Sequence, residues 1–190
     1  MTTAIQIIAA VVTLGALYFA VKLILGAYLR YRGTRVVTCP ETGGYVAVEV
    51  DAKHAALTTP LGEPDLRLRS CTRWPEKQDC GQDCLWQIEH SPESCLAETM
   101  IDEWYQGKTC VYCGKGFKDL DWLDNKPALV SPDLKTVEWR EVQPERIPEV
   151  LATHKAVCYD CHVAEGFRLH HPELVVDRPW HRGSHGEYRP

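Results

Sequence analysis

The first thirty residues contain a long apolar run without helical or strand periodicity. From Ile7 to Leu25 the one charged side chain is Lys22. These nineteen residues would form a helix about 28 Å long, close to the hydrocarbon thickness of a bilayer. The pattern therefore predicts a transmembrane helix over residues 4–29, with Lys22 near one end, where its amine can reach the headgroups.

The charges beside this helix predict its orientation. No Lys or Arg precedes it, whereas Arg30, Arg32 and Arg35 follow it. Positive residues stay preferentially on the cytoplasmic side of a membrane. We therefore expect a single-pass membrane protein with its N-terminus outside and its soluble region in the cytoplasm. A cleaved signal peptide is the alternative, but it usually has a positive beginning and a small-residue cleavage site, and neither is clear here.

Alternating polar and apolar residues predict two short strands after the helix. They cover residues 45–50 and 66–69, and each is bounded by residues typical of turns. If the two strands pair as a hairpin, Cys39 and Cys71 lie near the same open end. The cysteines of this region could then meet although they are far apart in the sequence.

Two helices are predicted next. The first covers residues 80–90 and would place Cys80 and Cys84 on one face, because residues four apart share a side of a helix. The second begins at Ser91 as N-cap and ends at Gly107. Its predicted buried stripe, at four-residue spacing, consists of Leu96, Met100 and Trp104.

The rest of the chain is more irregular. A cysteine-containing turn over residues 109–116, a strand over 136–142 and a short helix over 147–156 are predicted. From residue 167 to 190 the periodicity disappears, which predicts an extended C-terminal tail. Trp180 lies in this tail beside a proline and is a candidate docking residue, because exposed tryptophans often anchor interfaces.

Composition narrows the class of protein. The chain has 190 residues, a net charge of −5 and nine cysteines. The acidic balance argues against broad nucleic-acid binding, which needs clustered Lys and Arg. We find no Ser-His-Asp set, no phosphate-binding glycine loop and no paired catalytic carboxylates. An enzyme is therefore the less favoured reading.

Two Cys-x-x-Cys pairs carry the clearest chemistry. They are formed by Cys110 with Cys113 and by Cys158 with Cys161. Two such pairs that come together supply four thiolates to one ion. Zinc prefers this soft tetrahedral donor set, and a site closed by four protein ligands has no open position for catalysis. We expect zinc at these four cysteines.

The first pair is followed by Gly114 and Lys115, and residues of about 108–166 resemble a zinc ribbon or a rubredoxin-type pair of knuckles. The separation between the pairs is longer than in many zinc ribbons. The resemblance implies a tetrahedral four-sulfur site that stabilises a small fold. It also leaves iron open, since rubredoxin-like iron uses the same ligands and transfers electrons.

The second pair allows other readings. Cys158, Cys161 and the following His162 match the attachment pattern of c-type haem, which requires a location outside the cytoplasm and leaves the first pair without a role. Thiol redox catalysis requires a Cys-x-x-Cys between a strand and the start of a helix. We expect the second pair to follow a helix, which disfavours this reaction.

The remaining cysteines are less regular. A second metal ion or an iron–sulfur cluster is predicted where four of them converge, namely Cys39, Cys71, Cys80 and Cys84. Reduced core cysteines and disulfides are the alternatives. Cys95 falls in the first turn of a predicted helix, where burial alone accounts for it.

The sequence thus predicts an α+β fold with a transmembrane helix (residues 4–29), a cysteine-containing α+β region (36–107), a zinc-ribbon-like region (108–166) and a tail (167–190). The soluble region is expected to be small, metal-stabilised and built from short β-hairpins and helices. The expected function is that of a membrane-anchored accessory subunit, with the bilayer and other subunits of a membrane complex as partners. Electron transfer by rubredoxin-like iron, an iron–sulfur cluster or haem is the alternative.

Overall fold

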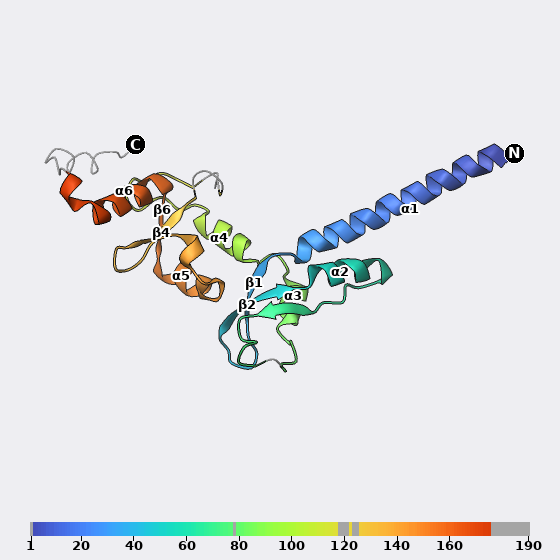
Figure 1. Ribbon diagram of the computed structural model, residues 1–190, viewed down its shortest axis with the longest axis horizontal. Coiled ribbons are helices and arrows are strands. Elements are labelled where there is room, and N and C mark those ends of the chain that lie inside the picture. The colour runs from blue at the N-terminus through green and yellow to red at the C-terminus, as the bar shows by residue number, and fades with distance from the viewer. Residues whose placement is uncertain (1, 78, 118–121, 123–125, 176–190) are drawn as a thin grey trace. The chain divides into compact units, whose positions relative to one another are not determined.

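A computed structural model describes residues 2–77, 79–117, 122 and 126–175 (Figure 1). The chain forms two compact units, Met1–Thr99 and Met100–Pro190. Each unit contains a three-stranded sheet with short helices, so the fold mixes helix and sheet as predicted. Trp180 lies outside the described residues.

The N-terminal apolar segment is one continuous helix, α1 (Thr2–Tyr31). Its 30 residues extend about 45 Å at the usual rise of an α-helix. The apolar side chains from Ile5 to Leu17 are exposed. By length and composition the helix is long and apolar enough to cross a membrane.

A buried arginine caps the C-terminal end of α1. The Arg35 side chain is 0% exposed, and its Nη1 donates to the carbonyl of Tyr31 at 2.8 Å and lies 3.2 Å from that of Arg32. Its Nη2 donates to the carbonyl of Arg30. The last carbonyls of a helix have no partner within the helix and carry partial negative charge, so a guanidinium is well suited to cap them.

The sheet of the first unit is an antiparallel meander of β1 (Thr34–Thr38), β2 (Tyr45–Val50) and β3 (Leu68–Cys71). The alternation over residues 45–50 and 66–69 predicted β2 and most of β3. The first strand was missed, because its short apolar core follows the arginine-rich flank of α1 without a clear alternation. The sheet brings the β1–β2 turn and the end of β3 to one side, as expected for Cys39 and Cys71.

A short helix that the sequence did not predict follows β2. It is α2 (Ala52–Thr58), continued by the 3-10 turn η1 (Thr59–Leu61). Asp51 caps α2 by accepting a hydrogen bond from the N–H of His54 at 3.0 Å. The small residues of α2 face the core, and the helix packs against α1 (Figure 1).

The two predicted helices of this region are shorter than expected. α3 covers Leu85–His90, so Cys80 lies outside it, and the prediction that Cys80 and Cys84 share a helix face is wrong. Gln82, between them, has a positive φ of 57°, which a helix does not allow.

The next helix, α4 (Ala97–Tyr105), begins after the turns that follow Pro92. Its buried stripe is also displaced by one residue from the predicted one. The buried residues are Ala97, Ile101 and Tyr105, whereas Leu96, Met100 and Trp104 are half-buried. Both sets have four-residue spacing, so the sequence could not separate them by period alone. Tyr105 decides the outcome, because its hydroxyl donates to the carbonyl of Ala128 at 2.8 Å in the core.

The second unit has a sheet in the order β5–β4–β6. The strands are β4 (Ala128–Val130), β5 (Thr136–Val137) and β6 (Lys155–Val157), and both pairings are antiparallel. The strand expected over residues 136–142 stops early, because a 3-10 turn, η2 (Trp139–Glu141), replaces its second half.

Helices flank this sheet. A 3-10 turn, η3 (Pro144–Arg146), leads into α5 (Ile147–Thr153), which starts with a proline in its first turn as predicted. After β6 the chain forms α6 (Tyr159–His170) and the 3-10 turn η4 (Pro172–Leu174). The first residues of the segment predicted as a tail are therefore helical.

Candidate metal centre

The first cysteine pair lies in a tight knuckle. Thr109 and Gly116 form a bridge that closes the turn. Inside it, the N–H of Cys110 donates to the carbonyl of Lys115 at 2.8 Å, and the N–H of Gly114 donates to the carbonyl of Cys110 at 2.9 Å. Gly114 has a φ of 75°, a conformation that glycine adopts without strain. The glycine after the second cysteine is thus what closes the knuckle.

The second pair lies where β6 passes into α6. Cys158 is the N-cap residue of α6, and Cys161 is in its first turn. The expectation that this pair follows a helix directly is wrong, because β6 intervenes between α5 and Cys158. The N–H of Val111 donates to the carbonyl of Ala156 at 3.0 Å, which fastens the knuckle to β6.

The fold brings the four thiols together. The sulfur atoms of Cys110, Cys113, Cys158 and Cys161 all lie within 4.8 Å of one another. Cys113 Sγ lies 3.6 Å from Cys158 Sγ. A tetrahedral site with metal–sulfur bonds of about 2.3 Å has sulfur–sulfur edges of about 3.8 Å. The cluster therefore fits one ion with little rearrangement.

Backbone amides favour negative charge in this cluster. Burial alone raises the pKa of the Cys110 thiol, but the N–H groups of Cys158 and the knuckle outweigh it and lower that pKa to about 7. The first of these bonds joins Cys158 N to Cys110 Sγ at 3.3 Å. Such N–H···S bonds orient and stabilise metal-bound thiolates.

The other thiols of the cluster are harder to ionise without a cation. Burial raises the pKa of Cys158. Burial and the neighbouring sulfurs raise the pKa of Cys161. A divalent ion would reverse this by supplying positive charge to all four sulfurs. A redox-active thiol at the start of a helix should instead have a lowered pKa, so the second pair does not have the electrostatics of such a catalyst.

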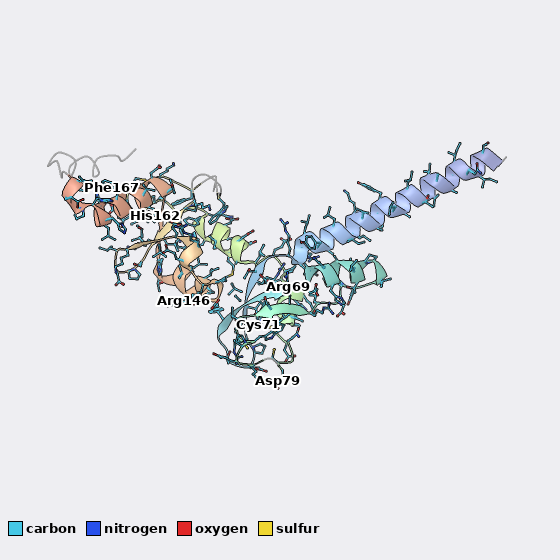
Figure 2. The ribbon with its side chains drawn as sticks, in the orientation of Figure 1. Arg69, Cys71, Asp79, Arg146, His162 and Phe167 are labelled. Atoms are coloured by element: carbon cyan, nitrogen blue, oxygen red, sulfur yellow. The ribbon has the colours of Figure 1, made fainter. Side chains whose placement is uncertain are left out.

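His162 directly follows Cys161 in α6 (Figure 2). Its Nε2 is 3.4 Å from Glu138 Oε1, and its buried Nδ1 has no hydrogen-bond partner among the described residues. A haem attached at Cys158 and Cys161 would take two of the four clustered sulfurs. One ion gives all four a common role, which the attachment pattern does not.

The other predicted ligands lie in the first unit around one pocket. Its lining includes Cys39, Cys71, Cys80 and Cys84. Their sulfurs are less tightly gathered, since among the described residues only the cluster of the second unit has its donor atoms close enough to hold an ion. Cys95 is half-buried, and its Sγ is 3.1 Å from the carbonyl of Ser91.

The pocket thiols differ in their electrostatics. A hydrogen bond from the Thr42 side chain, against the effect of burial, lowers the pKa of Cys39 to about 7, with Arg73 assisting. Burial raises the pKa of Cys84 to about 11. The sequence analysis missed Arg73, whose Nη1 donates to Cys39 Sγ at 3.0 Å. No motif marks this arginine, because only the folded β1–β2 turn brings it to the sulfur.

Comparison with protein-family models, with curated proteins and with solved structures found no match. The arrangement itself is that of a four-thiolate site. It can hold a soft divalent ion and join the knuckle to the β6–α6 junction.

Proposed function

We propose that this protein is a membrane-anchored, zinc-binding accessory subunit of a membrane protein complex. Zinc at Cys110, Cys113, Cys158 and Cys161 would stabilise the second unit, and α1 would hold the chain in the bilayer with both units in the cytoplasm. The observation that carries the proposal is the gathering of four sulfurs from two distant pairs within 4.8 Å.

The donor set supports a structural ion. Four protein sulfurs fill a tetrahedral coordination sphere and leave no position for substrate or water. The four cysteines also lie where several chain segments meet: Cys110 and Cys158 pack in one small cluster with Val130 and Val157. An ion at this place would join the knuckle, the sheet and α6.

An apolar row on α6 supports a role in assembly. Tyr159, Val163 and Phe167 follow one another at four-residue spacing and are 42%, 49% and 48% exposed. Rows of this kind are uncommon on surfaces that meet only water. Figure 2 labels Phe167 on this helix. A neighbouring subunit of the membrane complex would cover this row.

Metal analysis tests the zinc site. We expect Cys110→Ser, in the full chain purified in detergent under reducing conditions, to lose the ion and to unfold the second unit. Cys95→Ser is the matched control and should keep both. Wild-type metal content and an unchanged fold in Cys110→Ser would contradict the proposal. For the topology, a phosphatase fused to the C-terminus should be inactive in cells, and an active fusion would place that end outside.

Electron transfer is a second candidate, favoured by one observation. Cys113 is the exposed member of the cluster, and a ligand sulfur at the surface offers a short path for electrons to a partner. Iron in this site would colour the purified protein and give a redox-dependent visible spectrum. A colourless protein with stoichiometric zinc would exclude this candidate.

A further inference from the structure

The turn between β1 and β2 has the backbone of a metal-binding knuckle. The N–H of Cys39 donates to the carbonyl of Gly44, and the N–H of Gly43 donates to the carbonyl of Cys39, both at 2.8 Å. The knuckle at Cys110 has the same two bonds between the same relative positions, at 2.8 and 2.9 Å. The φ of Gly43 is 69°, close to the 75° of Gly114.

One residue differs between the two turns. Thr42 stands at the position that Cys113 occupies in the other knuckle, so the β1–β2 turn offers one thiol instead of two. Three further thiols reach the same pocket from other segments. Cys71 ends β3, Cys84 precedes α3, and Cys80 comes from the loop between them.

The pocket between these thiols suits an ion. Its volume is about 30 Å³, whereas one water-sized sphere needs roughly 10–15 Å³. Much of its remaining wall is apolar and includes Val46, Leu68 and Trp74. Figure 2 marks its surroundings with Cys71 at the end of β3 and Asp79 in the loop before α3. Apolar walls keep water away from metal–thiolate bonds.

Positive side chains stand beside the pocket. Arg73 donates to Cys39 Sγ at 3.0 Å, and Lys77 also lines the pocket. Glu41 forms ion pairs with both, its Oε2 lying 2.9 Å from Lys77 Nζ and 3.7 Å from Arg73 Nη1. Four thiolates around a divalent ion carry a net charge of about −2. Arg73 and Lys77 would offset part of it, against the negative charges of Glu41 and Asp83, which also line the pocket.

The loop that supplies Cys80 lacks regular structure. None of the described residues from 72 to 84 belongs to a strand or helix, and loops longer than about 12–15 residues are uncommon in compact domains unless they are functional or act as linkers. Gln82 has a positive φ of 57°, and its side chain accepts a hydrogen bond from the N–H of Leu68 at 2.9 Å. The loop is therefore held against β3, beside the cysteines.

From these observations we propose that Cys39, Cys71, Cys80 and Cys84 bind a second zinc ion, independent of the ion in the second unit. The ion would clamp the β1–β2 turn, the end of β3 and the start of α3, and it would order the loop from 72 to 84. Among the described residues no three of these sulfurs are gathered as closely as those of the second unit, so closing the site requires the segments around the pocket to move their thiols together.

Zinc content of single and double variants tests the proposal. The full chain is purified in detergent with a thiol reductant, and zinc per chain is measured by mass spectrometry. Wild type should carry two equivalents, Cys80→Ser one, Cys110→Ser one, and the double variant none. Cys95→Ser should keep two. Cys80 is the best first variant, because it lies in a loop and its replacement opens no cavity in the core.

The outcomes separate the two sites. One equivalent in wild type that Cys110→Ser abolishes and Cys80→Ser leaves intact overturns the second site while the first stands. One equivalent that only Cys80→Ser abolishes does the reverse. A disulfide between any two of the pocket cysteines in protein isolated without reductant but with its free thiols blocked also overturns the proposal.

A rescue variant uses the likeness of the two turns. Thr42→Cys completes a Cys-x-x-Cys in the β1–β2 turn, so combined with Cys80→Ser it should restore two equivalents of zinc. Replacing zinc by Co²⁺ gives a second readout, because thiolate–cobalt charge-transfer absorption should halve in Cys80→Ser and recover in the combined variant. Recovery of neither signal would show that the turn does not present its thiols to the pocket.

Discussion

The two units both gather cysteines near the end of a small sheet, but the cysteines have different relations to the core. In the second unit Cys110 and Cys158 are 2% and 6% exposed and are themselves members of a core cluster. In the first unit the cluster is mainly aliphatic, with four valines, Ala55 and Ile88, and of the pocket cysteines only Cys84 belongs to it, while Cys39 and Cys71 border it. We infer that an ion would be essential to the second core and supplementary to the first.

Removal of the metal is the strongest test of this difference between the two cores. Zinc binding contributes about 10–16 kcal/mol to the folding of zinc-finger peptides, whereas a whole domain is stable by about 5–15 kcal/mol. A strong chelator under reducing conditions should therefore abolish amide protection throughout β4, β6 and α6. In the first unit, protection should fall only in the β1–β2 turn and in residues 72–84.

Hydrogen exchange with mass spectrometry measures both units in the same sample. Adding zinc back should restore the protection, which controls for damage by the chelator. Equal loss of protection in the two units would contradict the inference that the first core is independent of metal. Unchanged protection in the second unit would show that its cysteine cluster is not structural.

The buried Arg35 tests the first unit by itself, because it stabilises that unit without any metal. Arg35→Ala leaves the last carbonyls of α1 without donors inside the protein, and we expect it to cost about 2–4 kcal/mol. The loss should appear in denaturant unfolding of the first unit and leave exchange in the second unit unchanged. Arg35→Lys keeps the charge but not the forked geometry, so its cost should be smaller. Equal stability of Arg35→Ala and wild type would show that the cap is dispensable.

The contrast between the units also explains what the sequence could predict. Each Cys-x-x-Cys is a local feature whose turn geometry follows from a few neighbouring residues, so the cluster of the second unit could be anticipated from spacing alone. The pocket of the first unit takes single cysteines from separate segments. Its shape depends on the pairing of β2 with β3 and on where α3 begins, which periodicity predicts only within several residues.

The incorrect predictions also concern features that depend on packing between segments. Cys80 was assigned to a helix because its spacing from Cys84 fits one. Gln82, which lies between them, has a positive φ, and a helix does not allow this. The stripe of α4 was placed one residue early, because only tertiary contacts of Tyr105 select between two sets of equal period. Long apolar segments and local turns were predictable, whereas short helices and their faces were settled by packing.

A single hydroxyl tests how far the second unit depends on interactions other than metal. Tyr105 is 0% exposed. Its hydroxyl accepts from Trp139 Nε1 at 3.0 Å and donates to the carbonyl of Ala128 at 2.8 Å. Tyr105→Phe leaves the buried carbonyl of Ala128 and the half-buried N–H of Trp139 without this hydroxyl and should cost about 1–3 kcal/mol. Zinc content should remain that of wild type, and unfolding of the zinc-bound protein by denaturant measures the loss. A loss of zinc would mean that this network positions the cluster.

The smallest effects concern the two turns whose backbones match. Gly43 and Gly114 have φ values of 69° and 75°, and a Cβ added at either would meet nothing within 4 Å. Alanine at each position should therefore cost about 1–2 kcal/mol through backbone strain alone, and asparagine should cost less, because it tolerates this conformation better. Gly116 is the control, since it has no positive φ and equal space around it, so Gly116→Ala should be close to neutral.

Similar costs for Gly43→Ala and Gly114→Ala, measured by denaturant unfolding of the zinc-bound protein, are expected if the β1–β2 turn is a knuckle like that of the second unit. No cost for Gly43→Ala would mean that this turn adopts another backbone in solution, and the likeness on which the second zinc site rests would be lost.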